Sequence, residues 1–163
     1  MGEVHVCCLE GRPLRIVLGG GCGGETGETP PRTRGCAVLE AVEAFFEGED
    51  CPEKVRSTLL DDPRFTPFQR RVYGVVCSIP RGNTLSYGEV ARRAGRAGAA
   101  RAVGSAMRRN PFPLLIPCHR VIRGDGSPGG YSGPPHAKPC LLALEGMELA
   151  PSPRGFLRKN GEA

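Results

Sequence analysis

The chain has 163 residues, enough for one domain or two small subdomains, and 39% of them are hydrophobic. A real core can therefore form, which excludes disorder as the default. No apolar run is long enough to span a bilayer, and no secretory signal is visible at the N-terminus. We therefore expect a cytoplasmic protein, or a nuclear one if the source is eukaryotic.

The net charge of +5 is divided unevenly along the chain. Residues 1–63 carry six Lys and Arg against 12 Asp and Glu, whereas residues 64–163 carry 16 against five. This segregation indicates that the second half meets a polyanion. Most of the cations are arginines, whose planar fork suits phosphates and bases. A GC-rich genome would also explain the excess of arginine, but it would not explain the segregation.

The eight cysteines show no Cys-x-x-Cys pair and no regular spacing. Because no export signal accompanies them, we expect most to be reduced and several, including Cys140, to be buried. A metal site is an alternative, but the spacing of its candidate ligands fits no zinc pattern. We therefore predict no metal and no cofactor. Those candidate ligands are His5, Cys7, Cys8 and Cys22.

The N-terminal part predicts a small sheet covered by one helix. Val4–Leu9 and Leu14–Leu18 are typical of two strands around the turn residues 10–13. Residues 19–31 predict a loop, and Ala37–Phe46 has apolar residues at helical spacing up to Gly48. Residues 51–66 hold two prolines and mixed charges, which indicates a connection between two halves.

The second half predicts a helix-turn-helix. A helix from Pro67, with one face formed by Phe68, Val72, Val75 and Val76, is broken by residues 79–82. Ser86 to Glu89 fits a reciprocal capping box, and the helix that follows ends at Ala94 before Gly95. A further helix runs from about Ala99 to Arg109 and is closed by Asn110-Pro111.

The second helix of this motif has an unusual surface for base reading. Ala99, Ala100 and Gly104 stand where a major-groove reader would carry long polar side chains. Small residues allow close approach to the minor groove, and Arg101 could enter the base stack in place of an extruded nucleotide. The alternative is an Ala- and Gly-rich helix packed tightly on a neighbour, with its arginines merely solvated.

Residues 116–121 hold the candidate nucleophile. Cys118 is followed directly by His119, which could act as a general base through a bridging water, since neighbours on a strand point to opposite faces. Residues 129–133 form a glycine-rich loop able to close over a ligand. A short helix over 138–144 would then bring Glu145 back to orient His119. Alone, a Cys-His pair is weak evidence.

Residues 67–149 closely resemble the C-terminal domain of the O6-alkylguanine-DNA alkyltransferase family. The segments that carry the resemblance occur in the family's order and spacing. The acidic N-terminal segment is similar to the family's first subdomain only in outline. These segments are residues 86–89, 100–104, 110–111, 116–121 and 130–133, with Lys138, Leu141, Leu142 and Glu145.

The resemblance implies a role for each matching residue. Cys118 would accept the alkyl group, with His119 and Glu145 as its relay, Tyr87 as a donor to guanine and Asn110 as a hinge. Cys118 and Val121 would offer carbonyls to the exocyclic amine, and Ser132 an amide to the alkylated oxygen. The expected DNA-binding residues are Tyr87, Ala99, Ala100, Arg101, Gly104, Ser105 and Arg108. The expected base pocket comprises Met107, Pro113, Val121, Tyr131, Ser132, Gly133 and Lys138.

The sequence thus predicts an α/β (α+β) protein with a structural subdomain over 1–62, a winged-helix-like DNA-binding and transferase domain over 63–150, and a frayed tail over 151–163. The expected function is DNA repair: a monomer extrudes O6-alkylguanine, and O4-alkylthymine as a further candidate, and transfers the alkyl group irreversibly. Two alternatives are a binding-only relative, which would lack the acceptor cysteine, and a helix-turn-helix regulator.

Overall fold

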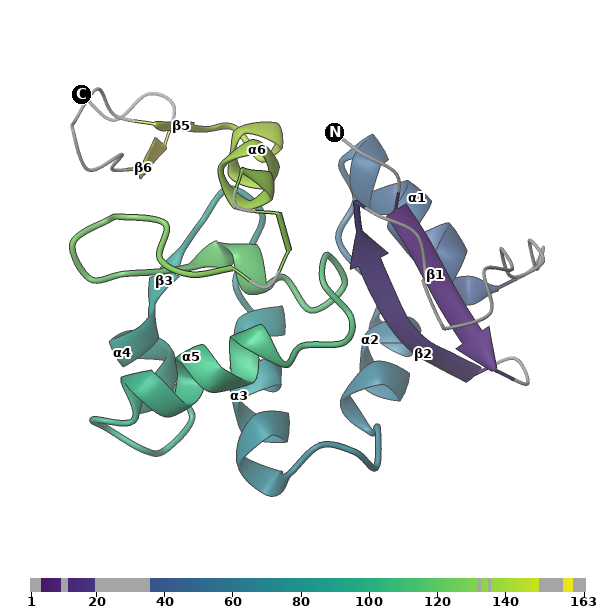
Figure 1. Cartoon of the computed structure of the whole chain (residues 1–163), viewed down its shortest axis with the longest axis horizontal. Helices are drawn as coiled ribbons and strands as arrows, with labels where there is room; N and C mark the ends of the chain where they lie inside the picture. The colour runs from purple at the N-terminus through teal and green to yellow at the C-terminus, as the bar shows by residue number, and fades with distance from the viewer. Residues whose placement is uncertain are drawn as a thin grey trace.

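The computed structural model describes residues 4–9, 12–19, 36–131, 133–134, 136–149 and 157–159. Within them, an N-terminal strand pair with its helix lies beside a larger and mostly helical body (Figure 1). One hydrophobic core continues from the strand pair into that body, because Ile16, Phe45 and Val72 belong to the same buried cluster. The α+β prediction is confirmed.

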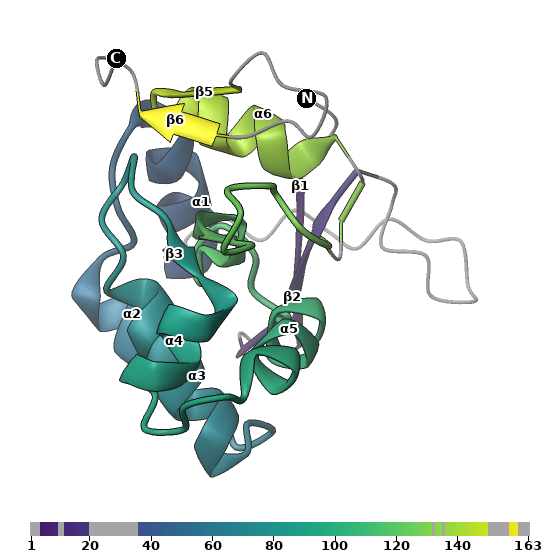
Figure 2. The same cartoon turned by 90° about the vertical axis from the view of Figure 1, so that its left-hand side faces the viewer.

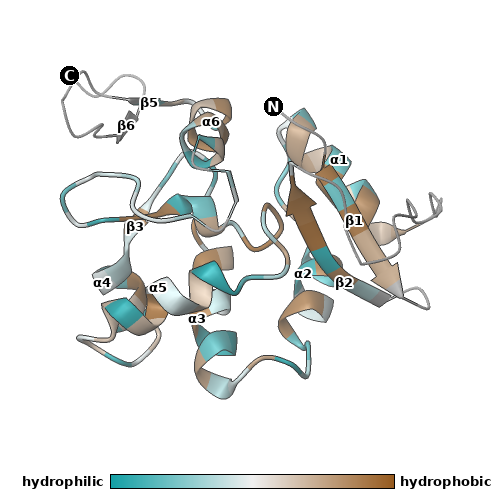
Figure 3. Cartoon of the chain, viewed as in Figure 1, coloured by the Kyte–Doolittle hydropathy of each residue, from teal (hydrophilic) through white to brown (hydrophobic). Residues whose placement is uncertain are grey.

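The strand pair consists of β1 (Val4–Leu9) and β2 (Arg12–Leu18), which run antiparallel with Val4 opposite Leu18. The sequence placed residues 12 and 13 in a turn, but they belong to β2, and the register shifts between Cys7 and Cys8 to accommodate them. Figure 3 shows β2 as mainly hydrophobic with one hydrophilic stretch.

Helix α1 (Ala37–Glu47) packs its apolar stripe into the core through Val38, Ala41, Val42 and Phe45. It ends at Gly48, whose φ of 104° is a left-handed conformation that glycine adopts without strain. Helix α2 (Glu53–Leu60) follows, where the sequence predicted only a connection. The sequence pattern of this helix is weak because Leu59 is its one fully buried residue.

Helix α3 (Pro67–Cys77) begins at a capping box formed by Thr66 and Gln69. Its buried residues are Val72, Tyr73 and Val76, whereas the predicted Phe68 and Val75 are only partly buried. Tyr73 takes the central position because its hydroxyl can donate to the carbonyl of Ala106, 2.8 Å away, while its ring fills the core.

Strand β3 (Leu85–Ser86) leads into α4 (Tyr87–Arg93), and α5 (Ala100–Arg108) completes the helix-turn-helix (Figure 2). The turn contains Gly95 with φ of 76°. Ser86 accepts from the amide of Glu89 as predicted. The reciprocal half of the capping box is absent, because the Glu89 carboxylate instead binds Arg92 and Arg93.

The remaining elements are a 3₁₀ helix, η1 (Cys118–Arg120), β4 (Val121–Ile122), α6 (Ala137–Leu144), β5 (Met147–Leu149) and β6 (Leu157–Lys159). Strands β3 and β4 pair in parallel, and β5 and β6 pair antiparallel. The pairing of β6 corrects the prediction that the whole of 151–163 is frayed. No helix in the described ranges is long and apolar enough to cross a membrane.

Six of the described cysteines carry free thiols, and Cys7 takes part in a disulfide. Cys140 is exposed on α6, so its predicted burial is wrong. Among the described side chains, no group of three or more His, Cys, Asp and Glu residues could hold a metal ion. Cys22, one of the candidate ligands, lies outside the described residues.

Candidate active site

Cys118 lies in the 3₁₀ turn η1, with 2% of its surface exposed. The extended strand expected here begins only at Val121, so the sequence prediction for residues 118 and 119 is corrected. Burial raises the pKa of the Cys118 thiol, while a hydrogen bond from Asn110 and the charge of Lys138 act in the opposite direction. Because the net shift is upward, the thiol needs a base to become a nucleophile.

His119 is fully buried and points toward the end of α6, where its Nε2 lies 2.8 Å from Oε1 of Glu145. Burial lowers the pKa of the His119 imidazole, so the ring is neutral near pH 7. A neutral ring that donates its Nε2 proton to a carboxylate has its lone pair on Nδ1. That Nδ1 is buried and has no partner in the described part of the chain, which leaves it able to accept a proton.

Glu145 collects three donors in the protein interior. Besides His119, its oxygens accept from Nε of Arg120 at 3.0 and 3.1 Å and from the amide of Gly82 at 3.2 Å. Burial raises the pKa of Glu145, but the hydrogen bonds and charges of His119 and Arg120 outweigh it and lower the pKa to about 2. Glu145 is therefore a fixed anion behind the imidazole.

Arg120 connects this anion to the rest of the molecule. Its guanidinium also donates to the carbonyl of Ile79 at 2.6 Å and to Oδ1 of Asp50 at 2.8 Å. Sequence reasoning assigned no role to Arg120 or to Gly82. Arg120 follows the Cys-His pair directly in the sequence. If this arginine is buried, it needs a carboxylate partner, so its position in the sequence could have prompted a search for an acidic residue. Gly82 gives no comparable signal.

Asn110 is buried between α5 and the segment that leads to Cys118. Its Nδ2 donates to the carbonyl of Ile116 at 2.8 Å, and its Oδ1 accepts from the amide of Phe112 at 3.0 Å. Within the loop so closed, Leu114 is the one described non-glycine residue with positive φ, at 76°. Asn110 therefore fixes the loop that precedes the thiol.

Tyr87 and Lys138 lie on the other side of the nucleophile segment. The pairing of β3 with β4 sets Ser86 opposite Ile122, directly before Tyr87, and the Tyr87 hydroxyl donates to the carbonyl of Gly130 at 3.2 Å. The buried ammonium of Lys138 donates to the carbonyl of Val121 and lies 5.6 Å from the centre of the Tyr87 ring. Burial lowers the pKa of Lys138 to about 8, against the opposing influence of Cys118.

Tyr131 and Gly133 belong to the glycine-rich loop, and Tyr131 lies beside the Cys118 thiol. Burial strongly raises the pKa of Tyr131, whose hydroxyl lies near Cys118 without an ordinary hydrogen bond. A Cβ on residue 133 would lie 2.8 Å from the Tyr131 ring, so only glycine lets that ring take this place. Ser132, predicted to face the alkylated oxygen, lies outside the described residues.

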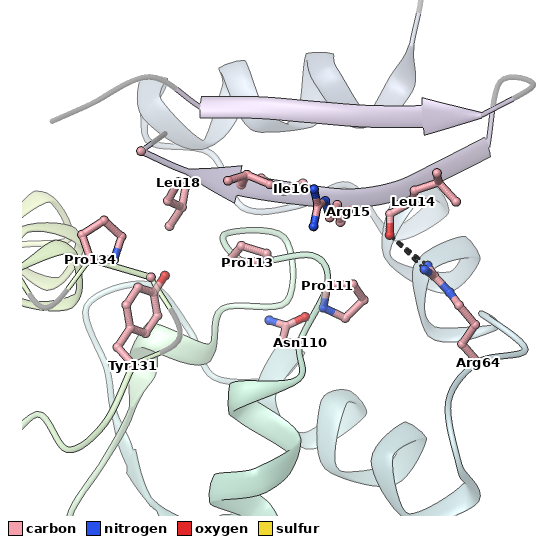
Figure 4. Close-up of a pocket in the computed structure, with 13 residues that line it drawn as sticks. Leu14, Arg15, Ile16, Leu18, Arg64, Asn110, Pro111, Pro113, Tyr131 and Pro134 are labelled. Atoms are coloured by element: carbon pink, nitrogen blue, oxygen red, sulfur yellow. Dashed lines mark hydrogen bonds between the residues drawn. The ribbon is translucent and has the colours of Figure 1, made fainter. Parts of the chain in front are cut away.

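A cavity of about 510 Å³ lies between β2 and this region (Figure 4). Of the predicted site residues, Asn110, Pro113, Tyr131 and Gly133 line it. Cys118, Met107, Val121 and Lys138 do not line the cavity, and all four are buried around the nucleophile segment.

Helix α5 presents the residues predicted to contact DNA. Arg101 and Arg108 are exposed and make no hydrogen bond or ion pair with any described residue, so both cations are available to a ligand. Ala99, Ala100 and Ser105 are partly exposed beside them. A Cβ on residue 104 would lie 4.0 Å from the Tyr87 ring, which shows how closely α5 approaches Tyr87.

Comparison with known proteins identifies this arrangement. Residues 67–147 match the family described as 6-O-methylguanine DNA methyltransferase, DNA binding domain. A methylated-DNA–protein-cysteine methyltransferase of Mycolicibacterium paratuberculosis is 42% identical over 120 residues, which cover 74% of this chain and 70% of that protein. The chain belongs to the methylated-DNA–protein-cysteine methyltransferase family.

Two further relatives of this methyltransferase family extend the comparison. The protein of the same name from Methanothermobacter thermautotrophicus is 50% identical over 112 residues, which cover 69% of this chain but only 61% of that protein. The crystal structure of Mycobacterium tuberculosis OGT in complex with DNA superposes with a TM-score of 0.69 at 34% identity, covering 87% of this chain and 85% of the other.

Proposed function

We propose that the protein repairs DNA by moving an alkyl group from O6 of guanine onto the sulfur of Cys118, once per molecule. The observation that carries this proposal is the burial of Cys118, His119 and Glu145 together, with Nε2 of the neutral imidazole bound to Glu145 and Nδ1 without a partner among the described residues. Membership of the methyltransferase family supports it independently.

The reaction begins with loss of the thiol proton. In this proposal a water between Cys118 and Nδ1 of His119 relays the proton, and Glu145 stabilises the imidazolium that forms. The thiolate then attacks the alkyl carbon on the face opposite O6. The new S–C bond forms while the C–O6 bond breaks, and its electron pair leaves with guanine.

Stabilisation of the departing guanine falls to the groups around the thiol. Tyr87 donates to a ring nitrogen, and the amide of Ser132 faces the oxygen that acquires charge. The carbonyls of Cys118 and Val121 accept from the exocyclic amine, while Lys138 holds the Val121 carbonyl in position. Met107 and Pro113 line the pocket, and the thioether product is stable, so the protein is consumed.

Access to the damaged base requires its extrusion from the duplex. Helix α5 approaches the minor groove through Ala99, Ala100, Gly104 and Ser105, and Arg108 binds phosphate. Arg101 occupies the space of the extruded nucleotide, as its exposure and its lack of a hydrogen-bond or ion-pair partner among the described residues allow. The protein acts as a monomer, with residues 1–62 as a structural subdomain and 63–150 as the reactive domain, in the cytoplasm or a eukaryotic nucleus.

Intact-mass spectrometry tests this function after incubation with a duplex containing O6-methylguanine. A mass gain of one methylene unit, mapped to the peptide with Cys118 and absent from Cys118→Ala, is the expected result. Tight binding to the lesion without any mass gain would instead favour a binding-only protein. Turnover of more than one equivalent of methylated DNA would contradict the single-use mechanism.

A further inference from the structure

Two free thiols are in contact where the N-terminal strand pair meets α1. The sulfur of Cys8 in β1 lies 3.7 Å from the sulfur of Cys36, although 28 residues separate the two in the chain. A disulfide bond is about 2.05 Å long, so a small movement of the two side chains would join the sulfurs. Neither thiol takes part in the site around Cys118.

The backbone directs both sulfurs toward this contact. The register of β1 shifts between Cys7 and Cys8, and a bulge of this kind re-aims a side chain. Cys7 takes part in a disulfide, so Cys8 is the free thiol of this strand. Cys36 is the N-cap residue of α1, and its side chain makes no capping hydrogen bond, so pairing with Cys8 would take no bond from the helix.

The pair is open to a reagent in solution and lacks the ligands of a metal site. The side chains of Cys8 and Cys36 are partly exposed, whereas only 2% of the surface of Cys118 is exposed. Structural zinc takes four ligands, and within the described ranges no group of three or more His, Cys, Asp and Glu residues could hold a metal ion. Oxidation is therefore the chemistry that suits this pair of thiols.

The contact joins two elements that both support the active site. Strand β2, the partner of β1, is tied to the loop that precedes Cys118, because the amide of Ile16 donates to the carbonyl of Pro111 at 2.7 Å. On α1, the ring of Phe45 lies edge-on to the imidazole of His119, with 5.7 Å between the ring centres. A bond between β1 and the start of α1 would hold these two supports together.

We propose that Cys8 and Cys36 form a reversible disulfide when the protein meets an oxidant of the small-molecule disulfide class, and that this bond locks α1 onto the strand pair. Cys36 loses its proton to solvent, attacks one sulfur of the oxidant and releases the other as a thiolate. Cys8 then loses its proton and attacks Cys36 in the mixed disulfide, which releases the second thiolate. The two cysteines lose two electrons and two protons, and the oxidant is reduced to two thiols.

The order of the two attacks follows from the surroundings of Cys8. Burial and the neighbouring sulfur of Cys36 raise the pKa of the Cys8 thiol to about 11. Cys8 therefore forms little thiolate near pH 7, and Cys36 is the thiol that attacks the oxidant first. The contact between the two sulfurs then makes the second attack intramolecular and fast compared with that of a thiol in solution.

Peptide mapping after mild oxidation tests the proposal. The reduced full-length chain is incubated with oxidised glutathione, its remaining thiols are blocked with N-ethylmaleimide under denaturing conditions, and it is digested without reductant. We expect a cross-linked peptide pair that joins Cys8 to Cys36, while Cys118 is recovered as a blocked thiol. Dithiothreitol should reverse the cross-link. The exposed Cys140 provides the matched control, since Cys140→Ser should keep the cross-link.

Melting temperatures measure the lock. Closure of a loop of this length should raise the melting temperature of the wild type by roughly 5–10 °C more than oxidation raises that of Cys36→Ser. Cys36→Ser keeps Cys7 and gives α1 a favoured N-cap residue, so it should fold when reduced. If it does not, Cys8→Ala provides the same comparison.

Three results would overturn the proposal. The first is glutathione retained on Cys8 or Cys36 without the cross-link, because a neighbouring thiol in contact should displace it. The second is a bond that joins Cys7, rather than Cys8, to Cys36. The third is an equal rise in melting temperature in the wild type and in Cys36→Ser. None of these measurements depends on alkyl transfer, so the outcome is independent of the proposed function.

Discussion

Nε2 of His119 lies 2.8 Å from Oε1 of Glu145, although 26 residues separate them in the chain. The contact forms because α6 ends at Glu145 directly beside η1, and both side chains are completely buried there. Its chemical consequence is a fixed tautomer. The hydrogen bond holds the proton on Nε2 and leaves Nδ1 as the basic atom.

Replacement of Glu145 by glutamine should therefore impair both reaction and stability. The variant Glu145→Gln can no longer stabilise an imidazolium, and it leaves the buried guanidinium of Arg120 without its main counter-ion. Loss of one partner of a buried pair costs about 3–5 kcal/mol. We expect alkyl transfer to slow by at least about tenfold. Single-turnover kinetics and chemical denaturation measure the two effects.

Asp50→Asn is the matched control for that variant. Asp50 binds the same guanidinium at 2.8 Å, but its side chain is 54% exposed and has no contact with His119. A solvent-exposed partner contributes about 1 kcal/mol at most. A transfer rate in Asp50→Asn as low as that of Glu145→Gln would show that the relay to His119 is not what Glu145 provides.

Acidification should destabilise the fold through the same two groups. Burial lowers the pKa of His119 below its ordinary 6.5, so below that pH the unfolded chain binds a proton that the folded chain resists. The pKa of Glu145 is about 2 against an ordinary 4.5, so its contribution is present above 4.5 and disappears as the pH falls toward 2. Urea denaturation between pH 7 and 3 should show stability falling in both ranges. In Glu145→Gln, the lower range should become flatter.

The sequence was sufficient to choose candidate residues but not to give their geometry. Residue type and the family resemblance together selected Cys118, His119 and Glu145, and the structure brings His119 and Glu145 into hydrogen-bond contact. The sequence placed the first two on an extended strand, because nothing in Ile116-Pro117-Cys118 distinguishes a 3₁₀ turn from a strand. The roles of Arg120 and Gly82 depend on long-range packing, which no local pattern encodes.

The same division holds for the fold. Helices α1 and α3 have apolar stripes and clear ends, and the sequence predicted both. Helix α2 was missed because Leu59 is its one buried residue, and a single buried residue does not produce the apolar spacing of 3.6 residues that predicts a helix. Glu89 was expected to cap its own helix by accepting from the amide of Ser86. Its carboxylate instead accepts hydrogen bonds from Arg92 and Arg93, which lie within one turn of it. Cys140 was expected to be buried, and only the rotation of α6 decides that it is exposed.

Lys138 should control the alkaline side of the pH–rate profile. Its charge opposes the rise in the pKa of the Cys118 thiol, and its own pKa is about 8. The transfer rate should rise with pH as the thiolate forms, and then level or fall above pH 8 as the ammonium loses its proton. Lys138→Met should slow transfer at least about tenfold and remove the alkaline limb. Lys54→Met, on the exposed surface of α2, should leave the profile intact.

Gly82 should be intolerant of any side chain. Its φ is +70°, and a Cβ there would lie 2.9 Å from the backbone carbonyl of Glu145. The variant Gly82→Ala must adopt a conformation that costs about 1–2 kcal/mol for other residues, and it must also push Glu145 away. Melting temperature and transfer rate should therefore both fall. Gly95→Ala, with φ of +76° but no neighbour within 4 Å, should lower the melting temperature while sparing the rate.

Arg101 should matter for damaged duplexes and not for the chemical step. It is exposed on α5 and makes no hydrogen bond or ion pair with any described residue, so Arg101→Ala should leave the melting temperature unchanged. If Arg101 fills the space of the extruded base, its loss should slow transfer from a duplex by roughly tenfold, since extrusion costs a few kcal/mol. The rate with the free base O6-benzylguanine should stay the same. Equal slowing with both substrates would place Arg101 in the reaction itself, and no slowing with the duplex would show that another residue supports the extruded state.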